Sequence, residues 1–80
     1  MKPGTPIPED TRRSIYERSK GRCEYCGARG EEIHHIVYRS HGGDNNEKNL
    51  IHLCRKCHNN IRILQEIAGN PEKYQGRYKW

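Results

Sequence analysis

The sequence contains few of the residues from which a small protein builds a hydrophobic core. Its 80 residues include no Phe, one Trp and one Met, hydrophobic residues make up 31%, and the mean hydropathy is −1.21. A chain of this length buries only about two thirds of its unfolded surface, so a core of this composition is marginal. Small polar chains usually need a disulfide or metal staple, and the four cysteines can supply one.

Two further absences narrow the class of protein. No apolar run approaches the roughly 20 residues of a membrane-spanning helix, and no basic segment followed by an apolar one opens the chain. We therefore expect a cytoplasmic protein with no membrane partner. In a reducing compartment, paired cysteines are more often metal ligands than disulfides.

Negative charge is the minority sign in this chain. Asp and Glu number 10 against 15 Lys and Arg, which gives a net charge of +5 and a pI near 9.2. A small basic domain favours a polyanionic partner, most often nucleic acid. The alternative is a solvated surface that its charge keeps soluble.

The distribution of Pro and Gly divides the chain into an arm, one domain and a tail. Residues 1–8 carry three prolines and one glycine and predict a flexible arm, whereas residues 9–20 lack both and predict a helix that Gly21 ends. We expect the domain itself to span residues 9–70. Residues 71–80 form a C-terminal tail with no clear period.

Within the domain, the pattern predicts an α+β fold. Apolar residues at 33, 36 and 37 and the segment "LIHLC" predict two short strands joined by a turn-rich loop, "SHGGDNNEKN". A second helix is expected from Lys56 or Cys57 to Ala68, ended by Gly69 and Pro71. We expect His52 on the second strand and Tyr74 in the tail to serve packing.

The four cysteines form two Cys-x-x-Cys pairs. Cys23 and Cys26 make the first pair and Cys54 and Cys57 the second, with residues 27–53 between them. Each pair can place two thiolates about 2.3 Å from a tetrahedral Zn²⁺, and two pairs complete the coordination sphere. We predict a structural zinc with no open position for a substrate; redox chemistry or two disulfides are the alternatives.

The histidines suggest a second site. His34 and His35 are neighbours on the expected strand, so their side chains point to opposite faces and do not hold one ion together. His58 follows the last zinc cysteine, and the zinc can bring it near the histidine strand. Phosphodiester hydrolysis needs a base for water, which an imidazole supplies near neutral pH, and stabilisation of phosphate and leaving-group charge, which a divalent ion supplies.

Four motifs of the sequence resemble the HNH endonucleases, from Cys23 to about Leu64: "CEYCG", "EIHHI", "GGDNNEKNLIHLC" and "CRKCHNNI". The order of His35, Asn49 and His58 matches the letters that name the family. The resemblance implies a ββα-metal core at about residues 32–68, a short hairpin and a helix around one catalytic ion, braced by the cysteine zinc. The predicted helix at residues 9–20 would be an addition to that core.

The resemblance also implies residue roles. His35 would be the general base, His34 and His58 the ligands of a catalytic divalent ion, and Asn49 a brace for the loop between the strands. Many relatives carry Asp at the position of His34, and an all-imidazole pair shifts the expected ion from Mg²⁺ toward Mn²⁺ or other transition ions. Arg62 stands where some relatives carry a further histidine.

The resulting expectation is a metal-dependent DNA endonuclease that leaves a 5′-phosphate and a 3′-hydroxyl. With one site per chain, a monomer or weak dimer should nick double-stranded DNA. Four basic residues are candidates for backbone phosphate contacts: Arg39, Arg55, Lys56 and Arg62. The alternative is a non-catalytic zinc-ribbon module that binds nucleic acid.

Overall fold

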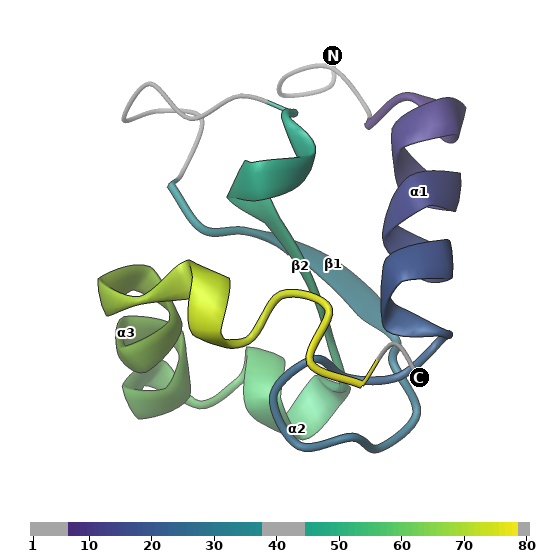
Figure 1. The fold of residues 1–80 in the computed structure, drawn as a ribbon. Helices are drawn as coiled ribbons and strands as arrows, with labels where there is room; N and C mark the ends of the chain where they lie inside the picture. The colour runs from purple at the N-terminus through teal and green to yellow at the C-terminus, as the bar shows by residue number, and fades with distance from the viewer. Residues whose placement is uncertain (1–6, 38–44, 79–80) are drawn as a thin grey trace, which may run out of the picture.

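The computed structural model describes residues 7–37 and 45–78 of the chain. In chain order, the helices and strands are α1 (Glu9–Ser19), β1 (Glu32–His35), the 3₁₀ turn η2 (Glu47–Asn49), β2 (Leu50–Leu53), α2 (Arg55–His58), α3 (Ile61–Gly69) and the 3₁₀ turn η3 (Pro71–Lys73). The two strands form an antiparallel hairpin, with α1 on one side and α2 and α3 on the other (Figure 1). The expected small α+β fold is confirmed.

Helix α1 begins and ends close to the expected residues. Pro8 precedes it, and Glu9 and Asp10 in its first turn stabilise the positive end of the helix dipole. The helix stops at Ser19, one residue earlier than expected. Lys20 adopts the left-handed conformation with φ 57°, so the C-cap falls on Lys20 and not on Gly21.

The expected second helix is two helices, and a continuous helix to Ala68 was therefore wrong. Asn59 and Asn60 separate α2 from α3, and Asn60 is extended at φ −108°, ψ 107°. The Asn60 side-chain oxygen accepts hydrogen bonds from the backbone N–H groups of Arg62 (3.0 Å) and Ile63 (3.3 Å). Asn60 thus acts as the N-cap of a new helix.

The first strand is shorter than expected, because β1 ends at His35 and leaves Ile36 and Val37 beyond it. The second strand lies where it was predicted, and all four of its residues are buried. Both faces of β2 are therefore covered, although the hairpin has only two strands.

The register of the hairpin sets which side chains share a face. His34 pairs with Ile51, and His35 pairs with Leu50. Directly opposed residues of an antiparallel pair project to the same face. Ile51 belongs to the main hydrophobic core, which joins β2 to the cysteines and to α3 through Cys23, Leu53, Cys54, Cys57, Ile67 and Tyr74. His34 therefore faces α2 and α3, and His35 faces the opposite side.

His52 fills the layer between β2 and α1. Its imidazole is fully buried, its Nδ1 lies 2.9 Å from the Ser19 hydroxyl, and the Tyr16 ring meets it edge-on at 4.6 Å between centroids. Gly30 lies so close that a Cβ there would overlap the imidazole. This closely packed environment fits the packing role expected for His52.

The first cysteine loop carries a buried carboxylate that ties several elements together. Glu24 is fully buried and accepts two hydrogen bonds from the Arg18 guanidinium, at 2.8 and 2.7 Å. Its oxygens also accept from the backbone N–H groups of His52 (2.9 Å) and Gly76 (2.7 Å). One side chain therefore joins α1, β2 and the C-terminal segment.

The C-terminal segment 71–78 packs against the domain, although its sequence predicts no regular structure. Tyr74 is buried, and its ring stacks on Tyr25 with 5.2 Å between centroids. Both hydroxyls donate to the same Glu66 carboxylate oxygen, at 3.2 and 2.9 Å. The segment thus covers the first cysteine loop and part of α3.

Candidate functional site

The four cysteines meet at one point of the fold. Their sulfur atoms all lie within 4.8 Å of one another, and the Sγ atoms of Cys26 and Cys54 are 3.7 Å apart. Two thiolates bound to a tetrahedral Zn²⁺ at about 2.3 Å would lie about 3.8 Å apart. The four cysteines are unbridged by disulfides, so they fit a structural metal.

Local backbone geometry supports this fit. The backbone N–H of Cys26 points at the sulfur of Cys23, and that of Cys57 at the sulfur of Cys54, each at 3.5 Å. Such contacts stabilise thiolates, which are the form that binds metal. Gly27, with φ 85°, lets the first loop turn sharply against the Tyr78 ring.

The ionisation of the cysteines shows how they influence one another. Burial raises the pKa of Cys57, and hydrogen bonds with neighbouring thiols raise it further. Burial acts in the same direction on Cys23, but backbone N–H groups outweigh it and lower the pKa to about 7. Burial thus opposes ionisation at Cys57, and a divalent cation would supply the charge that four thiolates require.

The two histidines to which the family resemblance gives a shared ion do come together. The rings of His34 and His58 lie edge-on with 5.3 Å between centroids. Two imidazoles bound to one ion at a tetrahedral angle, with nitrogens about 2.1 Å from it, would have centroids about 5 Å apart. His34 comes from β1 and His58 from the last position of α2, directly after a cysteine of the metal cluster.

Burial keeps the His34 imidazole neutral. Its side chain is 8% exposed, and desolvation lowers its pKa to about 4, helped by the nearby charges that His58 and His35 would carry. A neutral imidazole keeps the lone pair with which it binds a metal. At neutral pH, His34 is therefore in the protonation state that binds metal.

Glu32 is a member of the site that the sequence analysis did not identify. Its carboxylate oxygen lies 3.2 Å from Nδ1 of His58. A carboxylate on one ring nitrogen fixes the tautomer of a histidine and directs the other nitrogen toward a metal. The signal was in the sequence, since Glu32 lies two residues before His34 and shares its face of the strand.

His35 has surroundings of its own on the opposite side of the strand. Its Nε2 lies 2.8 Å from the side-chain oxygen of Asn45. An amide oxygen only accepts, so Nε2 carries the hydrogen in this arrangement and Nδ1 keeps a lone pair. Asn45 was also missed, because nothing in a turn-rich loop distinguishes one asparagine from its neighbours.

Asn49 connects the two strands at the end of the hairpin. Its side-chain oxygen accepts from the Val37 backbone N–H at 2.8 Å, and its side-chain nitrogen donates to the Val37 carbonyl at 3.1 Å. This side chain therefore contacts both backbone groups of one residue, two positions after His35.

The candidate phosphate ligands differ in their surroundings. Arg55, Lys56 and Arg62 are exposed, and Arg55 lies 3.8 Å from the Glu31 carboxylate. Arg39 lies outside the described residues. Arg62 is the second residue of α3, so its side chain lies near the start of that helix, across the Asn59–Asn60 break from His58.

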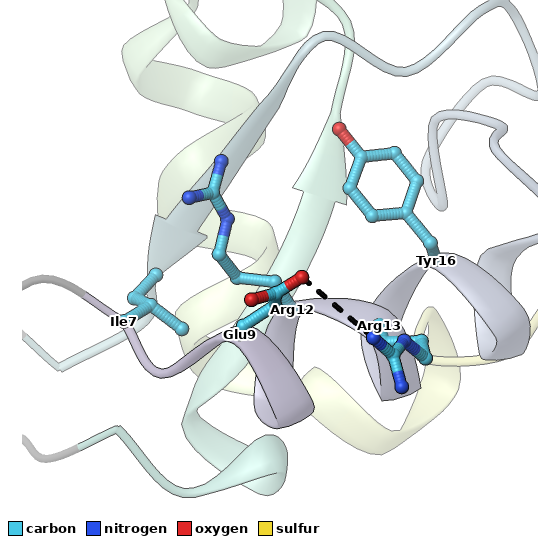
Figure 2. Close-up of a pocket in the computed structure, with 5 residues that line it drawn as sticks. All are labelled: Ile7, Glu9, Arg12, Arg13 and Tyr16. Atoms are coloured by element: carbon cyan, nitrogen blue, oxygen red, sulfur yellow. Dashed lines mark ion pairs between the residues drawn. The ribbon is translucent and has the colours of Figure 1, made fainter.

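Two hollows lie on different sides of the molecule. One, of about 290 Å³, is lined by His34, by Ile36 and Val37 just after β1, and by residues of α3 that include the exposed Ile61. The other, of about 370 Å³, lies on α1, where Glu9 and Arg13 form an ion pair at 3.6 Å and Arg12 and Tyr16 project (Figure 2). Only the first adjoins the histidines.

The fold and its site define a small metal-binding α+β domain in which a hairpin and a helical turn bring two imidazoles together beside a four-cysteine cluster. Residues 23–62, half of the chain, match the family described as HNH endonuclease. The chain belongs to this family, as the four motifs suggested. Membership of this family supports a nuclease function for the chain.

One curated relative agrees with this membership. The chain is 33% identical over 57 residues to the type IV methyl-directed restriction enzyme EcoKMcrA of Escherichia coli (strain K12). The match covers 59% of this chain and 21% of the relative. The chain thus spans about a fifth of the length of that enzyme. Within residues 7–37 and 45–78, no helix is long and apolar enough to cross a membrane.

Proposed function

We propose that this chain is a metal-dependent endonuclease that hydrolyses phosphodiester bonds of double-stranded DNA. The observation that carries the proposal is the division of the adjacent histidines. His34 faces His58, with 5.3 Å between the ring centroids, while His35 faces the other side and bonds to Asn45. One strand thus presents an imidazole for a metal ion and another for a proton.

Zn²⁺ fits the cysteine cluster, and a second divalent ion fits the histidine pair. Cys23, Cys26, Cys54 and Cys57 would hold the zinc as a structural brace. Its binding free energy, about 10 kcal/mol or more for such sites, would become folding free energy. That contribution offsets the small core of this polar chain.

His34 and His58 would hold the catalytic ion, with phosphate oxygens and water at its other positions. Two protein ligands occupy only part of the coordination sphere of a divalent ion, so this site would leave positions open for a substrate. When bound there, the ion supplies charge stabilisation for the phosphate and the leaving oxygen. Two imidazole ligands favour Mn²⁺ over Mg²⁺.

His35 would act as the general base. Asn45 holds the hydrogen on Nε2, which leaves Nδ1 to take a proton from water as its oxygen attacks phosphorus. As the water oxygen bonds to phosphorus, the bond to the 3′ oxygen breaks, and that oxygen takes a proton from solvent water, giving a 5′-phosphate and a 3′-hydroxyl. Asn49 would position the His35 strand end through Val37. One such site per chain cuts one strand, so a monomer nicks.

Basic side chains at the start of α2 and α3 would hold the substrate. Arg55, Lys56 and Arg62 are exposed beside the metal-binding turn, where they can contact backbone phosphates and make binding salt-dependent. Arg39 completes the proposed set.

A supercoiled plasmid tests the proposal. Zinc-loaded protein free of other metals is given Mg²⁺ or Mn²⁺, and conversion to open circles is followed for the wild type, His35→Ala and Lys73→Ala, a surface control. We expect nicking by the wild type and the control, and a loss of about 10²- to 10⁴-fold in His35→Ala. DNA retardation without cleavage under either ion would refute the proposal and favour the non-catalytic zinc-ribbon module.

A further inference from the structure

The backbone from Glu47 to Leu50, which we name the asparagine segment, contains Asn49 and is held from two sides. On one side, Arg18 of α1 donates to the carbonyls of Glu47 at 3.0 Å and Leu50 at 2.7 Å. On the other, the Gln75 side-chain amide donates to the carbonyls of Lys48 at 2.8 Å and Leu50 at 3.1 Å. We call these two donors, the Arg18 guanidinium and the Gln75 amide, the clamps, and the Leu50 carbonyl accepts from both.

The remaining carbonyl of the segment is also engaged. The oxygen of Asn49 accepts from the backbone N–H of Ile36 at 2.8 Å, next to the histidine strand. Each carbonyl from Glu47 to Leu50 thus has a donor, and two of the four accept from Gln75. A 3₁₀ turn of three residues satisfies few of its own backbone groups, so the side-chain donors fix its position.

Gln75 is itself anchored through its neighbour. The backbone N–H of Gly76 donates to the buried Glu24 carboxylate at 2.7 Å, and Arg18 binds the same carboxylate. Gly76 is buried and adopts φ 73°, a conformation open to glycine. One carboxylate inside the first cysteine loop therefore anchors both clamps, Arg18 directly and Gln75 through the neighbouring Gly76.

We propose that Gln75 is a positioning residue of the nuclease site. It acts on Asn49 by fixing the backbone of the asparagine segment, and Asn49 in turn holds both backbone groups of Val37, two residues after His35. The C-terminal segment is thereby a working part of the enzyme, although it lies outside the 23–62 family match. The catalytic part of this inference rests on the proposed function.

Three variants separate this role from general packing. Gln75→Met keeps the length of the side chain but removes its donors, and Gln75→Lys restores a donor. Tyr78→Phe removes a different hydrogen bond of the same segment, from the Tyr78 hydroxyl to the Tyr25 carbonyl at 3.4 Å, and serves as the matched control.

The first readout is amide hydrogen exchange in zinc-loaded protein, which needs no activity. The Val37 amide, which Asn49 holds, should exchange roughly fivefold to thirtyfold faster in Gln75→Met, the range for loss of one or two hydrogen bonds. The Glu24 amide, bonded to the His52 carbonyl at 2.7 Å, should keep its wild-type rate. Tyr78→Phe should leave both unchanged. Equal acceleration of both amides, or none at Val37, overturns the proposal.

The second readout is plasmid nicking. We expect kcat of Gln75→Met to fall about tenfold with KM for DNA within twofold, because Gln75 touches the asparagine segment and not the substrate. Gln75→Lys should recover most of kcat. An unchanged kcat beside a faster Val37 amide overturns the catalytic part. If the wild type never cleaves and the Val37 amide is selectively faster in Gln75→Met, the proposed function is refuted, but Gln75 still positions the asparagine segment.

Discussion

The buried Glu24 carboxylate should be the most sensitive polar side chain for stability. Its replacement by Gln keeps the shape but puts an NH₂ group against donors. Four hydrogen bonds are affected, two from Arg18 and one each from the N–H groups of His52 and Gly76. A buried donor left without its acceptor costs about 1–3 kcal/mol.

The magnitude follows from how the oxygens are shared. Each carboxylate oxygen accepts two of the four hydrogen bonds. The Gln side chain keeps one oxygen, so about half of these hydrogen bonds are lost, and Arg18 keeps its carbonyl partners. We expect Glu24→Gln to lower the free energy of unfolding by about 3 kcal/mol. An 80-residue chain has roughly 4–12 kcal/mol in total, so this is a large fraction.

Urea denaturation of zinc-loaded protein measures the effect. With a slope of about 1 kcal/mol per molar for a small domain, the unfolding midpoint should fall by about 3 M. Glu17→Gln removes an exposed carboxylate of α1; it is the control and should change the midpoint little.

Two outcomes would refute this reasoning. A loss below about 1 kcal/mol for Glu24→Gln would mean that the carboxylate does not organise its neighbours. The double mutant with Arg18→Met should show a coupling of about 1–3 kcal/mol. Simple additivity would show that the Arg18 bond contributes nothing beyond the two backbone amides.

Four further predictions follow from the site and the helix ends. Glu32→Gln should weaken Mn²⁺ binding about 10- to 100-fold by calorimetry; Glu31→Gln is the control, and a change under twofold would contradict the role given to Glu32. The His34 ring should titrate by NMR near pH 4 in protein without the catalytic ion. Since the unfolded imidazole binds its proton near pH 6.5, stability should fall as pH drops from about 6.5 through 4; a midpoint near 6 would argue against burial. Chelation of the cysteine-bound metal should abolish the far-UV circular dichroism of the helices, and a retained spectrum would contradict a structural role. Asn60→Ala should cost about 1 kcal/mol in thermal unfolding, and no change would mean that its cap is dispensable.

Much of the architecture follows from local patterns in the sequence. The absence of Pro and Gly predicted α1, and the spacing of the cysteines predicted their cluster. Strand alternation predicted that His34 and His35 face opposite sides, as the register shows. The position of His58 directly after a cysteine predicted its approach to the histidine strand. The roles given to these residues stay predictions.

The remaining features depend on contacts that no local pattern encodes. Asn59 and Asn60 fit an interrupted or a continuous helix equally well by spacing, and the cap at Asn60 decides between them. Glu24 and Gly76 meet across 52 positions of sequence, and Gln75 reaches Lys48 across 27. Such long-range hydrogen bonds arise only when the whole domain has packed.

The break between α2 and α3 has a thermodynamic consequence for the two proposed metals. His58 ends a helix of only four residues, which includes Cys57 and follows Cys54. A helix this short has little stability by itself, so the ion at the cysteines would fix the position of the histidine ligand. Coupling between binding sites is reciprocal. Mn²⁺ at the histidines should therefore raise the affinity of the cysteines for zinc by the same factor by which zinc raises the affinity of the histidines for Mn²⁺.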